Sequence, residues 1–165
     1  MTGDTTFQSG FPLDVVDSQF LSLSCWAYTY YGCADSPNVV ASPQYANPRT
    51  SAFVNADLGG TKTRYDYWFN PNTFAVESPG TFGNAGRNML RGPGLNNFDF
   101  SLMKDTNITS DGTKRIELRF EFYNLFNHTQ FNPAGVSTNI ASSNFGRITS
   151  AYASRIVQLA AKIYF

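Results

Sequence analysis

The sequence has 165 residues, about the length of one domain, and its 12 acidic and 12 basic residues cancel, which argues against nucleic acid as a partner. Charged residues make up only 15% of the chain, against about 25% in typical soluble domains, while aromatic residues reach 16%. No apolar run approaches the roughly 20 residues of a membrane-spanning helix, so the composition favours a β-rich chain.

The first predicted strand spans residues 4–16. Its alternate apolar residues share one side, namely Phe7, Phe11, Leu13 and Val15. Pro12 has no N–H to donate, so we expect it at the end or the edge of a strand. The next region, residues 17–95, shows no periodicity and holds six of the 8 prolines. Irregular chain of this length is unusual inside a compact domain and favours a very long loop.

The clearest pattern predicts a hairpin over residues 96–123, with strands at 96–108 and 113–123. One face of both arms is apolar and comprises Phe98, Phe100, Leu102, Ile116, Leu118, Phe120 and Phe122. Each arm has about the 9–11 residues of a tilted membrane strand. The segment "TSDGT" between the arms is typical of a type I turn with Gly112 in the left-handed conformation.

Two registers are compatible with this hairpin. A three-residue loop "SDG" places Phe100 opposite Phe122 and Leu102 opposite Phe120. Pairing Asp99 with Arg119 would instead place Phe100 opposite Leu118. We predict the first register, because exposed ion pairs contribute only about 0–1 kcal/mol whereas the turn type fixes the register directly.

The other face of the hairpin is polar and carries Asp99, Arg115, Glu117, Arg119 and Glu121. The four charges of the second arm alternate in sign about 7 Å apart and can neutralise one another, as on the wet lumen wall of a barrel. A substrate or gating role is an alternative. Acid–base catalysis is another, and it would require carboxylates that converge on a pocket.

In the last predicted strand, residues 154–165, apolar residues occupy every second position up to the final residue. One face is wholly apolar and comprises Val157, Leu159, Ala161, Ile163 and Phe165. Soluble domains usually end in a few frayed polar residues instead. The apolar face therefore requires an apolar medium.

Few residues suggest other chemistry. His128 is the only histidine, so no histidine cluster for a metal exists, and we expect no cofactor. Cys25 and Cys33 either form a disulfide in an oxidising compartment or remain two thiols. Four loop aromatics either contact a ligand or pack within the loops, namely Trp26, Tyr28, Tyr30 and Trp68. No Ser/His/Asp order, P-loop or dinucleotide motif is present, so we do not expect an enzyme.

Several ordered segments resemble the C-terminal end of TonB-dependent outer-membrane receptors, and the resemblance is greatest to the Oar-like group with a carboxypeptidase-regulatory-like domain. They are "YWFNPNTFAVESPGTFGNAGRNMLRGPGLNNFDFSLMK", "RIELRFEFYNLFNHTQFNPAG", "SSNFGRITSA" and "RIVQLAAKIYF". "FQSGFPL" at 7–13 and "SPNVV" at 36–40 are similar to the strand and loop that precede them. Residues 19–35 do not share this resemblance.

The resemblance implies an all-β fold, an antiparallel transmembrane β-barrel fragment containing about the last four strands of a barrel of about 22. Residues 17–95 would be a very long extracellular loop, 96–123 a hairpin and 154–165 the terminal strand. The lipid-facing residues would be Phe98, Phe100, Leu102, Leu118, Phe120, Phe122, Leu159 and Ile163. Phe165 would be the C-terminal assembly signal, with the C-terminus in the periplasm.

The function that the resemblance implies is binding of an extracellular substrate and its passage across the outer membrane. The implied partners are outer-membrane lipid, the plug and earlier strands of the same receptor, the TonB complex and the barrel-assembly machinery. The fragment alone is expected to have no activity. The alternative is a secreted β-sandwich that binds carbohydrate or protein, and such a sandwich would cover both of its sheets.

Overall fold

The computed structural model describes residues 1–23, 35–49, 53–54, 63–64 and 66–165. Its strands are β1 (Thr2–Gln8), β2 (Pro12–Leu13), β3 (Asn38–Val39), β4 (Phe53–Val54), β5 (Thr63–Arg64), β6 (Phe74–Ala75), β7 (Leu90–Arg91), β8 (Leu95–Asn107), β9 (Arg115–Tyr123) and β10 (Ile156–Tyr164). Two short 3-10 turns are η2 (Pro71–Thr73) and η3 (Pro133–Gly135). None of the helical segments in these ranges is long and apolar enough to cross a membrane.

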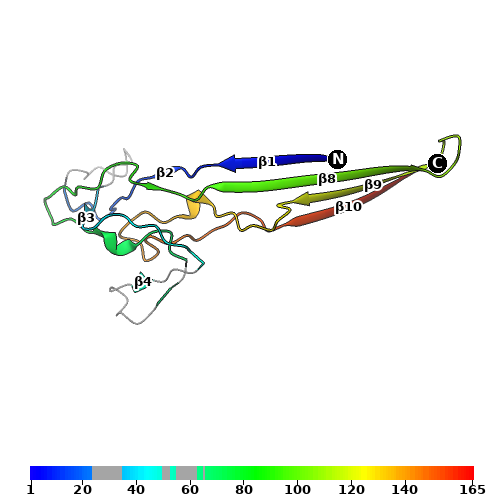
Figure 1. Ribbon diagram of the computed structural model, residues 1–165. Helices are drawn as coiled ribbons and strands as arrows, with labels where there is room; N and C mark the ends of the chain where they lie inside the picture. Colours follow the sequence, from blue (N-terminus) through cyan, green and yellow to red (C-terminus); the bar gives the residue numbers. More distant parts are fainter. Residues whose placement is uncertain (24–34, 50–52, 55–62, 65) are drawn as a thin grey trace. The chain divides into compact units, whose positions relative to one another are not determined.

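The chain divides into two compact units. Unit 1 consists of Met1–Ser9, Gly94–Gln130 and Ala151–Phe165, and unit 2 of Gly10–Pro93 and Phe131–Ser150. Unit 1 contains the long strands and unit 2 the short ones (Figure 1). The predicted all-β fold class is confirmed.

Unit 1 is a four-stranded antiparallel sheet in the order β1-β8-β9-β10 (Figure 1). Strands β9 and β10 have 9 residues each, which matches the roughly 9–11 residues of a strand that crosses a bilayer at a tilt, and β8 is longer, with 13 residues. Within the described residues, β1 and β10 have a partner on one side only, so the sheet is open at both edges.

The hairpin register is the one that the turn predicts. Phe100 lies opposite Phe122 and Leu102 opposite Phe120. Gly112 has a φ of 73°, as the left-handed position of this turn requires. Asp111 closes the loop by accepting hydrogen bonds from the backbone N–H (3.1 Å) and hydroxyl (2.9 Å) of Thr113.

The first strand differs from the prediction. The expected strand at 4–16 is divided into β1 and the short β2, and these belong to different units. Gly10 lies in the break, and a Cβ there would overlap the carbonyl group of Gly92. Close approach of these two backbone segments, which the alternating pattern does not reveal, interrupts the strand. Pro12 begins β2, as expected for a residue without an N–H.

Unit 2 contains the apolar core. Its two-stranded ladders are β2–β7, β3–β6 and β4–β5. The buried apolar cluster comprises Val15, Phe69, Phe74, Leu90, Val136, Phe145 and Ile148. The rings of Phe69, Phe74 and Phe145 pack edge to face with centroids 5.3–5.9 Å apart. Much of the region expected as irregular loop therefore packs around its own core. Burial of each of these apolar side chains stabilises unit 2 by about 1.5–3 kcal/mol.

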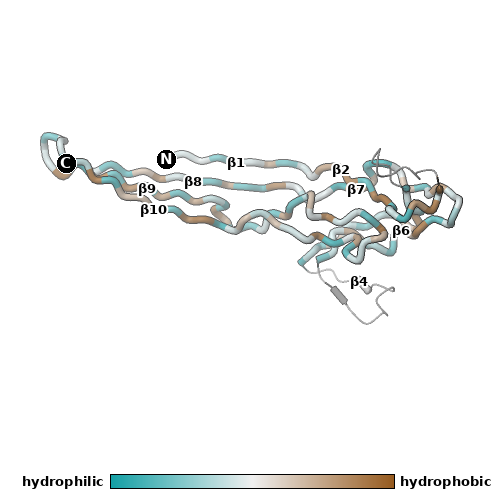
Figure 2. Tube along the Cα trace, turned by 180° about the vertical axis from the view of Figure 1, so that it is seen from behind, coloured by the Kyte–Doolittle hydropathy of each residue, from teal (hydrophilic) through white to brown (hydrophobic). Residues whose placement is uncertain are grey.

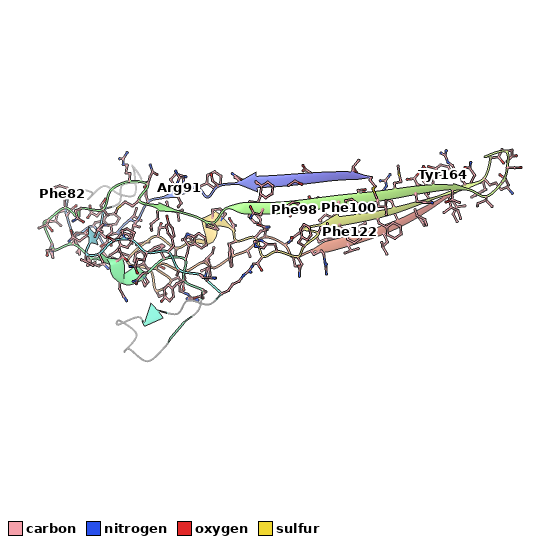
Figure 3. The ribbon with its side chains drawn as sticks, viewed as in Figure 1. Phe82, Arg91, Phe98, Phe100, Phe122 and Tyr164 are labelled. Atoms are coloured by element: carbon pink, nitrogen blue, oxygen red, sulfur yellow. The ribbon has the colours of Figure 1, made fainter. Side chains whose placement is uncertain are left out.

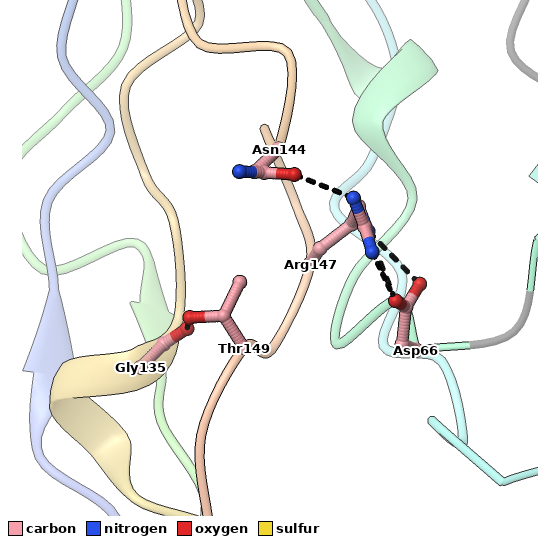
Figure 4. Close-up of polar contacts among 5 residues, drawn as sticks. All are labelled: Asp66, Gly135, Asn144, Arg147 and Thr149. Atoms are coloured by element: carbon pink, nitrogen blue, oxygen red, sulfur yellow. Dashed lines mark hydrogen bonds and ion pairs between the residues drawn. The ribbon is translucent and has the colours of Figure 1, made fainter.

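An ion pair joins two distant segments of unit 2. The Nε atom of Arg147 donates to both carboxylate oxygens of Asp66 at 3.0 Å, and its Nη2 atom also contacts Oδ2. The Nη1 atom of Arg147 donates to Oδ1 of Asn144 at 2.5 Å (Figure 4). Nearby, the hydroxyl of Thr149 donates to the carbonyl oxygen of Gly135. The hydrogen bonds to Asp66 raise the pKa of this guanidinium, and they outweigh burial, which lowers it.

Candidate functional site: the two faces of the sheet

No residue of β1, β8, β9 or β10 is buried. The sheet thus presents two open faces, which we call the apolar face and the polar face, and the described residues of unit 1 contain no second sheet to cover either of them. This arrangement contradicts the β-sandwich alternative, in which inner faces pack against each other. Figure 2 shows hydrophobic and hydrophilic residues alternating along these strands.

The apolar face gathers every predicted lipid-facing residue on one side of the sheet. On β8 and β9 these are Phe98, Phe100, Leu102, Leu118, Phe120 and Phe122, and on β10 Leu159 and Ile163, which lie opposite Phe120 and Ile116. Leu159 is 66% exposed and Ile163 60%, a degree of exposure that is costly for aliphatic side chains in water. The face is therefore suited to an apolar medium.

Aromatic rings cover the end of the apolar face away from the turn. Phe98 packs edge to face with Phe7 (centroids 5.4 Å apart) and with Phe126 (5.1 Å). Figure 3 labels Phe98, Phe100 and Phe122 along the sheet. Sequence reasoning did not assign Phe126, which lies beyond the hairpin, to this aromatic group.

Lys104 interrupts the apolar face. It lies opposite Leu118, on the same side as Leu102, and is exposed. Its place near the turn allows the aliphatic stem to lie along apolar neighbours while the ammonium group reaches a polar boundary. This residue marks one end of the apolar stretch of β8.

The charges of β9 form a connected network on the polar face. Arg119 contacts Glu117 at 3.2 Å and Glu121 at 3.9 Å. The hydroxyl of Tyr164 donates to Glu117 at 3.2 Å. Because each carboxylate faces a cation or a hydroxyl, the alternating charges compensate one another, as the sequence pattern predicted.

Tyr164 lies on the polar face opposite Arg115, at the end of the β9–β10 pair that is nearest the turn (Figure 3). The guanidinium carbon of Arg115 lies 4.2 Å from the centre of its ring, and the ammonium nitrogen of Lys162 lies 4.6 Å from it. Cation–π contacts of this kind contribute about 0.5–1 kcal/mol at exposed sites. Arg115 is thus held by an aromatic ring rather than by a carboxylate.

The other half of the polar face is acidic. Asp4 lies directly opposite Asp99 across β1 and β8, and Glu121 lines the same shallow recess of about 210 Å³. Asp99 accepts hydrogen bonds from the side-chain amide of Asn97 (2.8 Å) and from the backbone N–H of Asn124 (2.9 Å). Asp4 was not singled out from the sequence, since only the β1–β8 pairing brings it beside Asp99.

A larger recess of about 420 Å³ lies at the end of the sheet away from the turn. Its polar and aromatic lining includes Asn97, Asp99, Tyr123, Gln130 and Tyr152. Apolar side chains, among them Leu95 and Ile156, line it too, and an apolar lining with a few polar groups is typical of small-molecule sites. No group of three or more His, Cys, Asp or Glu side chains in the described part of the chain is placed to hold a metal ion.

The remaining candidates lie elsewhere. Trp68 is half-buried in unit 2, where its indole N–H donates to the carbonyl oxygen of Arg91 at 2.7 Å and its ring meets Tyr45 edge to face. His128 is exposed, as expected of a loop-surface histidine. Five candidates fall outside the described residues, namely Cys25, Cys33, Trp26, Tyr28 and Tyr30, so the disulfide and their ligand contacts stay predictions.

Phe165 is 99% exposed and follows β10 at the end of the sheet where the β8–β9 turn lies (Figure 1). The two long connections, residues 9–94 and 124–155, both leave the sheet at the opposite end. The sheet is therefore asymmetric, with one short turn and the C-terminus at one end and all long connections at the other.

The family model described as outer membrane beta barrel domain matches residues 1–158 of the chain. No curated protein and no solved structure matches the chain.

Proposed function

We propose a function from one premise, which is that the chain belongs to the outer membrane beta barrel domain family. It is thus part of an outer-membrane barrel protein. Our proposal is that it forms the C-terminal strands of a TonB-dependent receptor of the Oar-like type, which binds a substrate outside the cell and moves it across the outer membrane. The ordered segments that resemble this group support this finer assignment.

The observation that carries the proposal is a sheet with two open faces and two open edges. In hydrocarbon, unpaired backbone groups at an edge cost several kcal/mol each, so spanning sheets close into barrels. Further strands beside β1 and β10 would complete such a barrel. We propose that lipid covers the apolar face, and that the polar face, with Asp99, Arg115 and the charges between them, lines the lumen.

The asymmetry of the sheet supports an orientation. Outer-membrane barrels have short periplasmic turns and longer extracellular loops. We propose that the β8–β9 turn and Phe165 face the periplasm, and that residues 17–95 and 124–153 belong to extracellular loops. In this position Phe165 is available to the barrel-assembly machinery before the barrel closes.

Epitope insertion tests the orientation. A tag inserted at Ser143, in the long connection of unit 2, is expected to bind antibody on intact cells. The same tag at Ser110, in the β8–β9 turn, is expected to bind only after the outer membrane is permeabilised. Both insertions lie in exposed turns, so each is the control for the other. Labelling of Ser110 on intact cells would reverse the proposed orientation.

A second experiment tests the receptor assignment. An antibody against this chain is expected to detect, in outer membranes of the native cells, a protein much longer than 165 residues that co-purifies with the periplasmic domain of TonB. A closed outer-membrane barrel that does not bind TonB would contradict the receptor assignment while leaving the barrel assignment intact.

A further inference from the structure

Unit 2 contains three buried carboxyl groups that have no part in the sheet of unit 1. Asp17 is 0% exposed, Glu77 2% and Asp35 5%. Backbone hydrogen bonds place Asp17 opposite Asp35, with N···O distances of 2.7 and 3.0 Å. Glu77 follows β6, which pairs with β3 just after Asp35. Three segments distant in sequence therefore bring three acids together.

The three carboxyl groups differ in the hydrogen bonds that they accept. Asp35 accepts from the backbone N–H (2.9 Å) and hydroxyl (2.5 Å) of Ser22, and Oδ1 of Asp17 accepts from the N–H of Gln19 (2.8 Å). Oδ2 of Asp17 and both carboxyl oxygens of Glu77 have no partner of good hydrogen-bond geometry among the described residues. A buried ionised carboxylate without partners is very costly, so such groups usually become neutral instead.

Among the residues that the structure describes, no cationic side chain forms an ion pair with Glu77. Burial, the largest influence, raises the pKa of its carboxyl group, and the nearby carboxylates of Asp17 and Asp35 and a hydrogen bond with Asp17 raise it further. Only its own backbone amide acts in the opposite direction. The described part of the chain places no group of three acids so as to hold a metal ion.

We propose that Glu77 and Asp17 form a proton-binding pair, in which the protonated carboxyl group of Glu77 donates a hydrogen bond to Oδ2 of Asp17. One proton is taken up from water and no other bond changes. The shared proton explains why these oxygens are without partners: two carboxylates contain no donor, whereas one acid and one carboxylate form a strong charge-assisted hydrogen bond. This is the arrangement by which two adjacent carboxyl groups avoid ionising together.

The pair makes the folding of unit 2 dependent on pH. Since the folded state holds the proton of Glu77 more tightly than the unfolded state, the contribution of the pair is fully present below pH 4.5, the ordinary value for this side chain. This contribution is lost as the pH rises through the pKa of Glu77 in the folded state. Ionised Glu77 would then add a negative charge beside Asp17 and Asp35 and weaken the contacts among the three segments.

Infrared spectroscopy of the full-length protein in detergent tests the pair directly. The native protein is expected to show the carbonyl band of a protonated carboxylic acid at pH values above 4.5, where an ordinary glutamate is ionised, and Glu77→Gln is expected to lose that band. The control is Asp14→Asn, which changes an exposed carboxylate of the same unit and keeps an oxygen for the N–H of Asn88. This control should retain the band.

A thermal melt of unit 2 provides a second readout that does not depend on the band. Glu77→Gln, which keeps the shape and can donate its amide N–H to Asp17, is expected to melt at a higher temperature than the native protein at mildly alkaline pH. The difference should disappear below pH 4.5. If Glu77→Gln kept the carbonyl band, or if the melting difference were the same at every pH, the proposal would be overturned.

Discussion

Phe100 lies directly across the β8–β9 pair from Phe122, with ring centroids 6.4 Å apart and ring planes tilted by 37°. The same pairing brings the hydroxyl oxygens of Thr109 and Thr113 to 3.4 Å at the turn. Asp99 binds Asn97 and Asn124 rather than Arg119, and Arg119 contacts Glu117 and Glu121 on its own strand. The turn, not charge pairing across the strands, thus sets the register.

Changing Gly112 tests the importance of the turn. The substitution Gly112→Ala is expected to lower the free energy of unfolding by about 1–2 kcal/mol, because a Cβ is disfavoured at a φ of 73°. Ser110→Ala in the same loop is the control and should have little effect. The measurement is equilibrium unfolding in lipid vesicles. Equal stability of both variants would mean that the turn does not constrain the hairpin.

The two faces of the sheet should respond differently to a new charge. Phe120→Arg places a cation on the apolar face and is expected to destabilise the inserted protein by about 2–4 kcal/mol near the bilayer centre. Ser101→Arg on the polar face, opposite Glu121, should be tolerated. Unfolding in vesicles measures both. If Ser101→Arg were the more harmful change, the proposed lipid and lumen sides would be exchanged.

The ion pair of unit 2 should distinguish arginine from lysine. Arg147→Lys keeps the charge but cannot reproduce the bonds to both Asp66 and Asn144, so a loss of about 1–2 kcal/mol in unit 2 is expected. The control Arg87→Lys changes an exposed arginine. The melting temperature of unit 2 provides the comparison, and identical melting of the two variants would show that the guanidinium geometry contributes nothing.

Removing the last residue should affect assembly more than stability. Phe165 is 99% exposed and thus has little packing to lose. If Phe165 is the assembly signal, as we propose, deleting it is expected to reduce the amount of assembled protein in the outer membrane. Phe82→Ala is the control, since Phe82 is 77% exposed in unit 2. The quantity to compare is folded protein in isolated outer membranes. If both variants reduced the amount of assembled protein equally, the result would contradict the proposed role of Phe165.

The hairpin and the two faces were predictable because they depend on local rules. Alternation with period two assigned Phe120 and Arg119 to opposite faces, and the turn residues around Gly112 fixed which side chains meet. The terminal strand was found by the same alternation, within two residues of the observed bounds of β10. Such signals are contained in consecutive residues and need no knowledge of distant contacts.

Unit 2 was not predictable in this way. Its core joins Val15, Phe74 and Ile148, which come from three separate segments without periodicity. The break after β1 has the same cause, since Gly10 meets Gly92. The buried acids Asp17 and Glu77 also read as ordinary loop residues until the β3–β6 ladder is known. Long-range packing, rather than local preference, determines these features.

The acidic half of the polar face has a consequence for dissolved ions. Asp4, Asp99 and Glu121 produce a negative electrostatic potential at the end of the sheet away from the turn, whereas Arg115 and Lys162 offset the acids nearer to it. A small cation near this face is therefore attracted more strongly at the first end than near the turn. At physiological ionic strength the effect extends over about 8 Å, so the face favours cations at its far end.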